Sequence, residues 1–100
     1  MDRFKNKVAL ITGSSQGIGA ACALRLAKEG ADIILNGHKF DERGEQLIAE
    51  IEEIGRKAKF ITADVSDVKA VTKLVKEAVV SFGGLDILVN NADLKLNLSF

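Results

Sequence analysis

A short stretch near the amino terminus combines glycines and hydroxyl side chains in the pattern of an anion-binding turn. It reads TGSSQGIG (residues 12–19), with glycines at Gly13, Gly17 and Gly19. After a strand, the first glycine lets the chain turn sharply, the second lets the backbone approach a diphosphate, and the third lets the following helix pack closely on the strand. The N–H groups and positive dipole end of that helix would then attract phosphate oxygens. The alternative interpretation is a glycine-rich turn that binds no ligand.

The other side chains of this stretch narrow the chemistry. Ser14 and Ser15 add hydroxyl donors between the first two glycines. A nucleoside-triphosphate loop of the Walker type is excluded, because no Lys-Ser or Lys-Thr pair follows the last glycine. The pattern therefore favours a dinucleotide, provided that a strand precedes the turn and a helix follows it.

Apolar runs and helical periods alternate along the chain and supply these elements. Four runs predict strands: KVALIT (7–12), ADIILN (31–36), AKFITA (58–63) and LDILVN (85–90). Runs that are apolar on both faces are typical of a buried parallel sheet. Helices are expected over residues 17–30, over residues 41–54, and from a cap at Ser66 or Asp67 to Phe82. The glycines expected to end them are Gly30, Gly55 and the Gly83-Gly84 pair.

Helical spacing also predicts which faces are buried. The second helix places Leu47, Ile48, Ile51 and Ile54 on one face, and the third forms a stripe of Val68, Val71, Leu74, Val75, Ala78, Val79 and Phe82. Right-handed crossovers then give an α/β fold, a truncated Rossmann-like doubly wound parallel sheet with strand order 3-2-1-4. The order reverses between strands 1 and 4, so a ligand is expected in the crevice beyond their carboxyl ends.

Composition excludes several classes of function. The chain has 100 residues, enough for one domain at most, and its 14 basic and 14 acidic side chains balance. We therefore expect no nucleic-acid groove and no membrane surface as partner, and no apolar run is long enough for a membrane span. The single cysteine, Cys22, favours a reducing cytoplasm and is expected to fill a small space in the core.

Three segments in order resemble the short-chain dehydrogenase/reductase family. TGSSQGIG is similar to its T-G-x-x-x-G-I-G signature, ADV (63–65) to its adenine-contacting Asp-Val, and LDILVNNA (85–92) to its N-N-A-G motif. Within the family, the sequence most resembles 3-oxoacyl-carrier-protein reductases and gluconate-type dehydrogenases. The resemblance covers residues 5–92, so residues 1–92 are interpreted as an NAD(P)-binding half-domain and 93–100 as an atypical tail.

The resemblance implies a role for each matching residue. The residues that would line the diphosphate and the adenosine ribose are Gly13, Ser14, Ser15, Gln16, Gly17, Ile18 and Gly19. Asp64 would accept from the adenine amino group and Val65 would pack beside the ring, unless Asp64 only starts the third helix. Asn91 and Ala92 would contact the nicotinamide-side ribose through their backbone. Asn90 is interpreted as a brace for the sheet, and Asp86 as an acid that caps a turn.

The end of the second strand bears on the choice between NAD and NADP. An acid there would bind the ribose 2′-hydroxyl and repel a 2′-phosphate. This sequence has Asn36 at that end, followed by His38 and Lys39, and no acid before Asp41. Because a lysine can pair with a 2′-phosphate, we expect a preference for NADP over NAD. Gln16 argues the other way, since the family's NADP-preferring members often carry a base in the glycine loop.

The family's catalytic residues have no counterpart here. The resemblance implies a tyrosine acid, a lysine four residues later and a serine, all on or after strand 5, but the chain contains no tyrosine. We therefore expect cofactor binding without hydride transfer by this chain alone. The alternatives are a non-enzymatic dinucleotide-binding module and one half of a split enzyme. A methyltransferase that uses S-adenosylmethionine is disfavoured, because that class has an acid at the end of strand 2.

The last residues depart from the family pattern. Asp93 stands where the family has glycine, and LKLNLSF (94–100) alternates apolar and polar residues with the two-residue period of a half-exposed strand. One interpretation is a frameshift, a gene break or an incomplete assembly. The other is a short strand that covers the edge of strand 4. An uncovered edge would invite self-association, and we expect a marginally stable, association-prone chain.

Overall fold

The computed structural model describes residues 3–13 and 17–91, which form alternating strands and helices. Their bounds are β1 (Val8–Ile11), α1 (Gly17–Lys28), β2 (Asp32–Gly37), α2 (Glu42–Ile54), β3 (Ala58–Thr62), α3 (Val68–Phe82) and β4 (Ile87–Val89). Each element lies within two residues of its predicted range. Ser14, Ser15, Gln16, Ala92 and the tail (93–100) lie outside the described residues.

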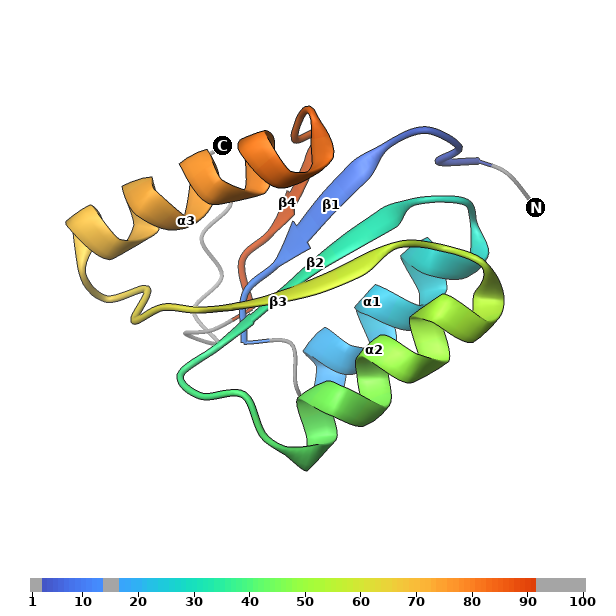
Figure 1. The fold of residues 1–100 in the computed structure, drawn as a ribbon, viewed down its shortest axis with the longest axis horizontal. Coiled ribbons are helices and arrows are strands. Elements are labelled where there is room, and N and C mark those ends of the chain that lie inside the picture. Colours follow the sequence, from blue (N-terminus) through green and yellow to red (C-terminus); the bar gives the residue numbers. More distant parts are fainter. Residues whose placement is uncertain (1–2, 14–16, 92–100) are drawn as a thin grey trace.

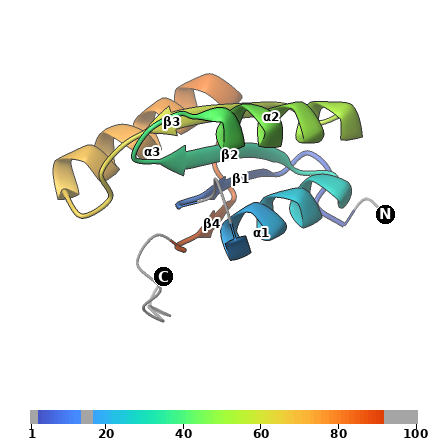
Figure 2. The ribbon, with the colours of Figure 1, turned by 90° about the horizontal axis from the view of Figure 1, so that it is seen from below.

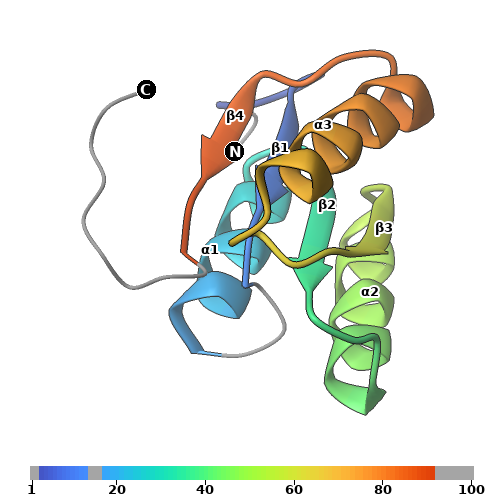
Figure 3. The same cartoon turned by 90° about the vertical axis from the view of Figure 1, so that its left-hand side faces the viewer.

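The strands form one parallel sheet in the order β3-β2-β1-β4, which confirms the predicted order. Leu10 in the middle of β1 lies opposite Ile34 of β2 on one side and Leu88 of β4 on the other. All carboxyl ends therefore meet at one edge of the sheet, and β3 and β4 are its two outer strands (Figure 3).

Helices cover both faces of the sheet, as a doubly wound fold requires (Figures 1 and 2). Alternate residues of β1 point to opposite sides. Ala9 and Ile11 belong to the core beneath α1 and α2, whereas Val8 and Leu10 belong to the core beneath α3. The apolar character of both faces of β1 is thus explained by two separate cores.

The helix ends follow the expected capping chemistry. Asp41 caps α2, accepting hydrogen bonds from the N–H groups of Arg43 and Gly44, and Gly55 ends that helix. Asp67, one of the two candidates, caps α3 by accepting from the Lys69 N–H, and Gly83 ends it. Each such cap satisfies backbone groups that the helix itself leaves unpaired.

Some predicted core positions are wrong. Val68 is 79% exposed, Val79 is 42% exposed and Ile54 is 37% exposed, although helical spacing placed them on buried faces. In α3 the fully buried side chains are Leu74 and Ala78, a narrower stripe than predicted, because this one helix meets the sheet along a single line of contact. Cys22 is half-buried and outside both cores, since α1 packs on the sheet through other residues.

Within the described ranges, no helix is both long enough and apolar enough to cross a membrane.

Candidate functional site

A hydrogen-bond network joins the carboxyl ends of β1 and β4, where the strand order reverses. Thr12, which is 6% exposed, lies at its centre, and its hydroxyl accepts from the Asn91 N–H at 2.9 Å. The same hydroxyl donates to Asn90 Oδ1 at 3.2 Å, and the Asn91 side-chain amide donates to the Gly13 carbonyl at 3.2 Å. The network fixes the start of the glycine turn relative to β4.

This network bears on two sequence expectations. Asn90 was expected to brace the sheet, and its bond to Thr12 does so. Asn91 was expected to contact a ribose through its backbone. Its N–H already donates to the Thr12 hydroxyl, so its carbonyl oxygen would have to make the contact with the ribose. Sequence reasoning missed Thr12, whose role depends on a register between strands 77 to 79 residues apart.

The glycine turn adopts backbone angles that suit close approach of a ligand. Gly13 has φ +58° and Gly17 has φ +61°, both in the left-handed region that side-chain-bearing residues avoid. The space where a Gly17 side chain would begin has no atom within 4 Å. Gly19 is buried in α1, as close helix–strand packing requires. Ile18 is 69% exposed, at the start of the helix.

The end of β2 is held to β3 by a buried amide. Asn36 is 1% exposed, and its side-chain N–H group donates to the Ile61 carbonyl at 3.1 Å and to the Ala63 carbonyl at 3.4 Å. This places the residues after β2 beside those after β3. His38 and Lys39 follow directly and are exposed to solvent. The positioning role of Asn36 was not predicted.

An aromatic pair fixes the loop that carries these two basic residues. The rings of Phe40 and Phe60 have centroids 5.0 Å apart, with 47° between their planes. Glycines make room for the pair: a Cβ on Gly37 would come within 2.9 Å of the Phe60 ring, and one on Gly44 within 2.9 Å of the Phe40 ring. The loop between β2 and α2 is therefore packed against β3 by its own side chain.

Asp64 follows β3 at the same edge of the sheet. Its Oδ1 accepts from the Ser66 hydroxyl at 2.7 Å and from the Ser66 N–H at 3.0 Å. These two bonds lower the pKa of Asp64 below its usual value, and the nearby His38 lowers it further against a small opposing effect of burial. Asp64 is therefore an ionised acceptor at neutral pH. One of its oxygens serves the start of α3, as the alternative interpretation expected.

Asp86 lies at the opposite end of the sheet. Its carboxylate accepts from the Val8 N–H at 2.9 Å, and its own N–H donates to the Val8 carbonyl at 2.9 Å. It ties the beginnings of β1 and β4 together, away from the glycine turn. The sequence predicted an acid that caps a turn; the observed bond instead crosses from β4 to β1, 78 residues away along the chain.

Taken together, the carboxyl edge gathers a glycine turn, two exposed basic residues and an ionised acceptor from three different strand ends. Such a set can bind an extended anion that also carries amine and hydroxyl donors. Among the residues that the structure describes, no group of three or more His, Cys, Asp or Glu side chains could hold a metal ion.

Comparisons with known proteins agree with this geometry. The family model for "short chain dehydrogenase" matches residues 7–99. The chain is 45% identical over 94 residues to a 3beta-hydroxysteroid dehydrogenase of Mediterraneibacter gnavus, covering 94% of this chain and 34% of that protein. It is 46% identical over 99 residues to a glucose 1-dehydrogenase of Gluconobacter oxydans, covering 95% of this chain and 36% of that protein. The chain thus spans about a third of the length of the curated relatives it matches.

Solved structures show the same likeness. A short chain dehydrogenase from Burkholderia cenocepacia in complex with NADP matches with a TM-score of 0.84 and 46% identity, over 94% of this chain and 42% of that chain. Carveol dehydrogenase from Mycobacterium avium in complex with NAD matches with a TM-score of 0.83 and 33% identity, over 92% of this chain and 37% of that chain.

Proposed function

Since the chain belongs to the short-chain dehydrogenase family, we propose that it binds a nicotinamide dinucleotide across the carboxyl edge of its sheet. The observation that carries this proposal is the left-handed backbone of Gly13 and Gly17, which lie after β1 and at the start of α1, beside the reversal of strand order. Doubly wound sheets bind dinucleotides at this kind of crevice. Two of the similar solved structures contain NADP or NAD.

Each candidate residue has a place in this proposal. The turn residues assigned to the diphosphate and adenosine ribose are Gly13, Ser14, Ser15, Gln16, Gly17, Ile18 and Gly19. Asp64 accepts from the adenine amino group, and Val65 packs beside the ring. Asn91, through its carbonyl, and Ala92 contact the nicotinamide-side ribose. The bound nicotinamide supplies hydride chemistry, and these residues bind and orient it.

We propose that the activity of the whole protein is hydride transfer between the nicotinamide and a carbonyl or alcohol substrate. The 100-residue chain contains no tyrosine to donate the proton that such a transfer needs. By itself it binds the cofactor and does not turn over substrate.

For the cofactor we propose a preference for NADP over NAD. His38 and Lys39 are exposed where β2 ends, and in this proposal both lie beside the adenosine ribose. The next acid along the chain, Asp41, accepts from the Arg43 and Gly44 N–H groups as the α2 cap, so its carboxylate is committed to that helix. A 2′-phosphate at the end of β2 would therefore have the Lys39 ammonium to pair with, and no acid directly following that strand.

Fluorescence titration of the purified chain with NADPH and NADH tests both proposals. We expect NADPH to bind more tightly, and S-adenosylmethionine not to displace it. Lys39→Glu should lower NADPH affinity about tenfold and NADH affinity much less, because it removes one charge-assisted contact with the 2′-phosphate. Lys76→Glu on α3 is the matched charge reversal and should change neither affinity. Equal losses for the two cofactors in Lys39→Glu would overturn the preference, and displacement by S-adenosylmethionine would overturn the function.

We also propose that the 100-residue chain self-associates through the outer edge of β4. In the described part of the chain β4 pairs only with β1, and Leu88 on it is 41% exposed. The formal net charge is +0, so no charge repulsion keeps two copies apart.

A further inference from the structure

We infer that the outer edge of β3 is a docking site for an extended acidic segment of a partner protein, which adds a strand to the sheet there. The site lies between α2 and α3, at the opposite side of the sheet from β4. It does not use the residues assigned to the cofactor, so it goes beyond the proposed function and does not depend on it.

The backbone of β3 is the first argument, because part of its polar groups face outward. On the inner side, the Lys57 carbonyl accepts from the Ile33 N–H at 2.9 Å. The Ala63 N–H likewise donates to the Gly37 carbonyl at 3.2 Å. Alternate residues of a strand turn their backbone groups to opposite sides. The residues that turn theirs away from β2 are therefore Ala58, Phe60 and Thr62. In the part of the chain that the structure describes, β3 pairs with β2 alone, and such an edge can accept one more strand.

The second argument is the space along this edge, on the side of α3. A hollow of about 570 Å³ lies beside the beginning of β3, between Glu52 of α2 and Ser81 and Phe82 of α3. A smaller hollow of about 110 Å³ lies beside the end of β3, lined by Ile61 of the strand and Leu74 of α3. Together the two hollows accompany β3 along its length.

The third argument is charge, because the part of the chain that borders these hollows is basic. Residues 56–82 carry six basic and three acidic side chains, whereas the whole chain has 14 of each. Two of the three acids, Asp64 and Asp67, accept hydrogen bonds at the start of α3. The third, Glu77, lies 3.7 Å from the Lys59 ammonium. The remaining positive charge favours an acidic partner and opposes pairing with the equally basic β3 of a second copy.

Lys57 and Arg56 bring this charge to the beginning of the edge. Lys57 is exposed, and the bond that positions it runs from its backbone N–H to the Asp32 carboxylate at 2.9 Å. Arg56 donates to two backbone carbonyls, which are neutral groups and do not cancel its charge. Glu52 is the acid that lines the same hollow. A carboxylate on an added strand would therefore be attracted by Lys57 and Arg56 more than it is repelled by Glu52.

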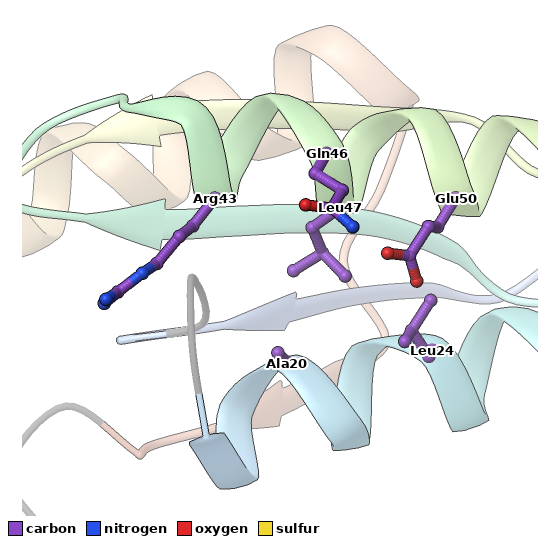
Figure 4. A pocket seen from close by; sticks show the side chains of 6 residues that line it. All are labelled: Ala20, Leu24, Arg43, Gln46, Leu47 and Glu50. Atoms are coloured by element: carbon purple, nitrogen blue, oxygen red, sulfur yellow. The ribbon is translucent and has the colours of Figure 1, made fainter.

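The groove between α1 and α2 lacks the features that an added strand needs (Figure 4). Leu47 and Glu50 of α2 point toward Ala20 and Leu24 of α1. Both walls are helices, whose backbone groups bond within each helix. An extended chain finds no strand edge there. Lys28 of α1, exposed beside this groove, is therefore a matched control position.

Fluorescence anisotropy with a labelled, end-capped peptide of alternating glutamate and valine tests the inference on the 100-residue chain. The peptide should bind, and its counterpart of alternating glutamine and valine should bind about tenfold more weakly, because it lacks the charge. Lys57→Glu should weaken the acidic peptide about tenfold and strengthen a peptide of alternating lysine and valine. Lys28→Glu, the matched charge reversal, should change neither affinity. Equal thermal unfolding midpoints of the two variants show that both are folded.

Backbone pairing is tested separately. Hydrogen exchange at the N–H groups of Ala58, Phe60 and Thr62 should slow when the peptide binds, and methylation of the peptide's own amides should abolish binding. Unchanged exchange at these residues would overturn the inference. So would equal binding of the glutamine peptide, or equal effects of Lys57→Glu and Lys28→Glu. Displacement of the peptide by oligothymidine would indicate a site for any polyanion, and displacement by NADP⁺ would place the peptide at the carboxyl edge; either would overturn the inference. The proposed function is tested by cofactor binding itself and stands or falls independently.

Discussion

Gly83 and Gly84 follow one another at the end of α3, but their backbone conformations differ. Gly83 has φ +80° and its N–H donates to the Val79 carbonyl, whereas Gly84 has no left-handed φ. At both positions an added Cβ would have no atom within 4 Å. Any difference between alanine substitutions at the two positions therefore measures backbone strain and not packing.

Alanine substitutions at these two glycines give a matched prediction. Gly83→Ala should lower the free energy of unfolding by about 1 kcal/mol, because an L-residue is strained in the left-handed region. Gly84→Ala should stay within about 0.5 kcal/mol of wild type. Urea denaturation followed by circular dichroism measures both. Equal effects of the two substitutions would mean that the cap does not hold α3.

Single residues also show how far the sequence predicts the site. The residue types of the turn, His38, Lys39 and Asp64 indicate an anion site with an acceptor, and the structure brings His38 near Asp64. The hydrogen bonds of Thr12 and Asn36 could not be predicted, because each depends on which strands are neighbours and in what register. Local pattern carries no information on such distant pairs.

At the scale of elements, the strands were predicted well because short, continuously apolar runs between helical segments leave few alternatives. The burial of α3 was predicted less well. Helical periodicity places Val68 and Val79 on the buried stripe, but they are 79% and 42% exposed. Val80, outside that stripe, is 83% exposed. How wide a stripe a helix buries depends on what lies beside it, and in the described part of the chain α3 alone covers its face of the sheet.

The outer strand β4 gives the prediction at this scale. Among the residues that the structure describes, nothing pairs with the outer edge of β4, and Leu88 on that strand is exposed, so the 100-residue chain should associate with itself. In sedimentation experiments the average mass should rise with protein concentration. Leu88→Lys should reduce that rise, because a charged side chain on an edge strand opposes pairing.

The control for this experiment is a lysine on the other outer strand. Thr62→Lys, at an exposed position of β3, should leave the mass distribution unchanged. A chain that stays monomeric at every concentration, with a sharp unfolding transition, would contradict self-association. So would an equal effect of the two substitutions, which would point to net charge and not to β4.

At the scale of the molecule, two cores on opposite faces of one parallel sheet hold the strand ends in register. The core beneath α1 and α2 includes both Ile33 of β2 and Ile51 of α2. The core beneath α3 joins Ile34 and Leu74. At the carboxyl edge, the polar side chains of Thr12 and Asn36 are buried beside the apolar ends of these cores. The sheet therefore positions the site, and the residues that follow the strands determine what binds.

The most direct measurement of the central claim is hydrogen–deuterium exchange of the backbone, with and without NADP⁺. Cofactor bound across the carboxyl edge should slow exchange in residues 12–20, 36–39, 62–65 and 88–91. Residues at the amino edge, 4–8 and 83–86, should exchange as they do without cofactor. Protection confined to the amino edge, or no protection at saturating NADP⁺, would contradict a dinucleotide site at the carboxyl ends of the strands.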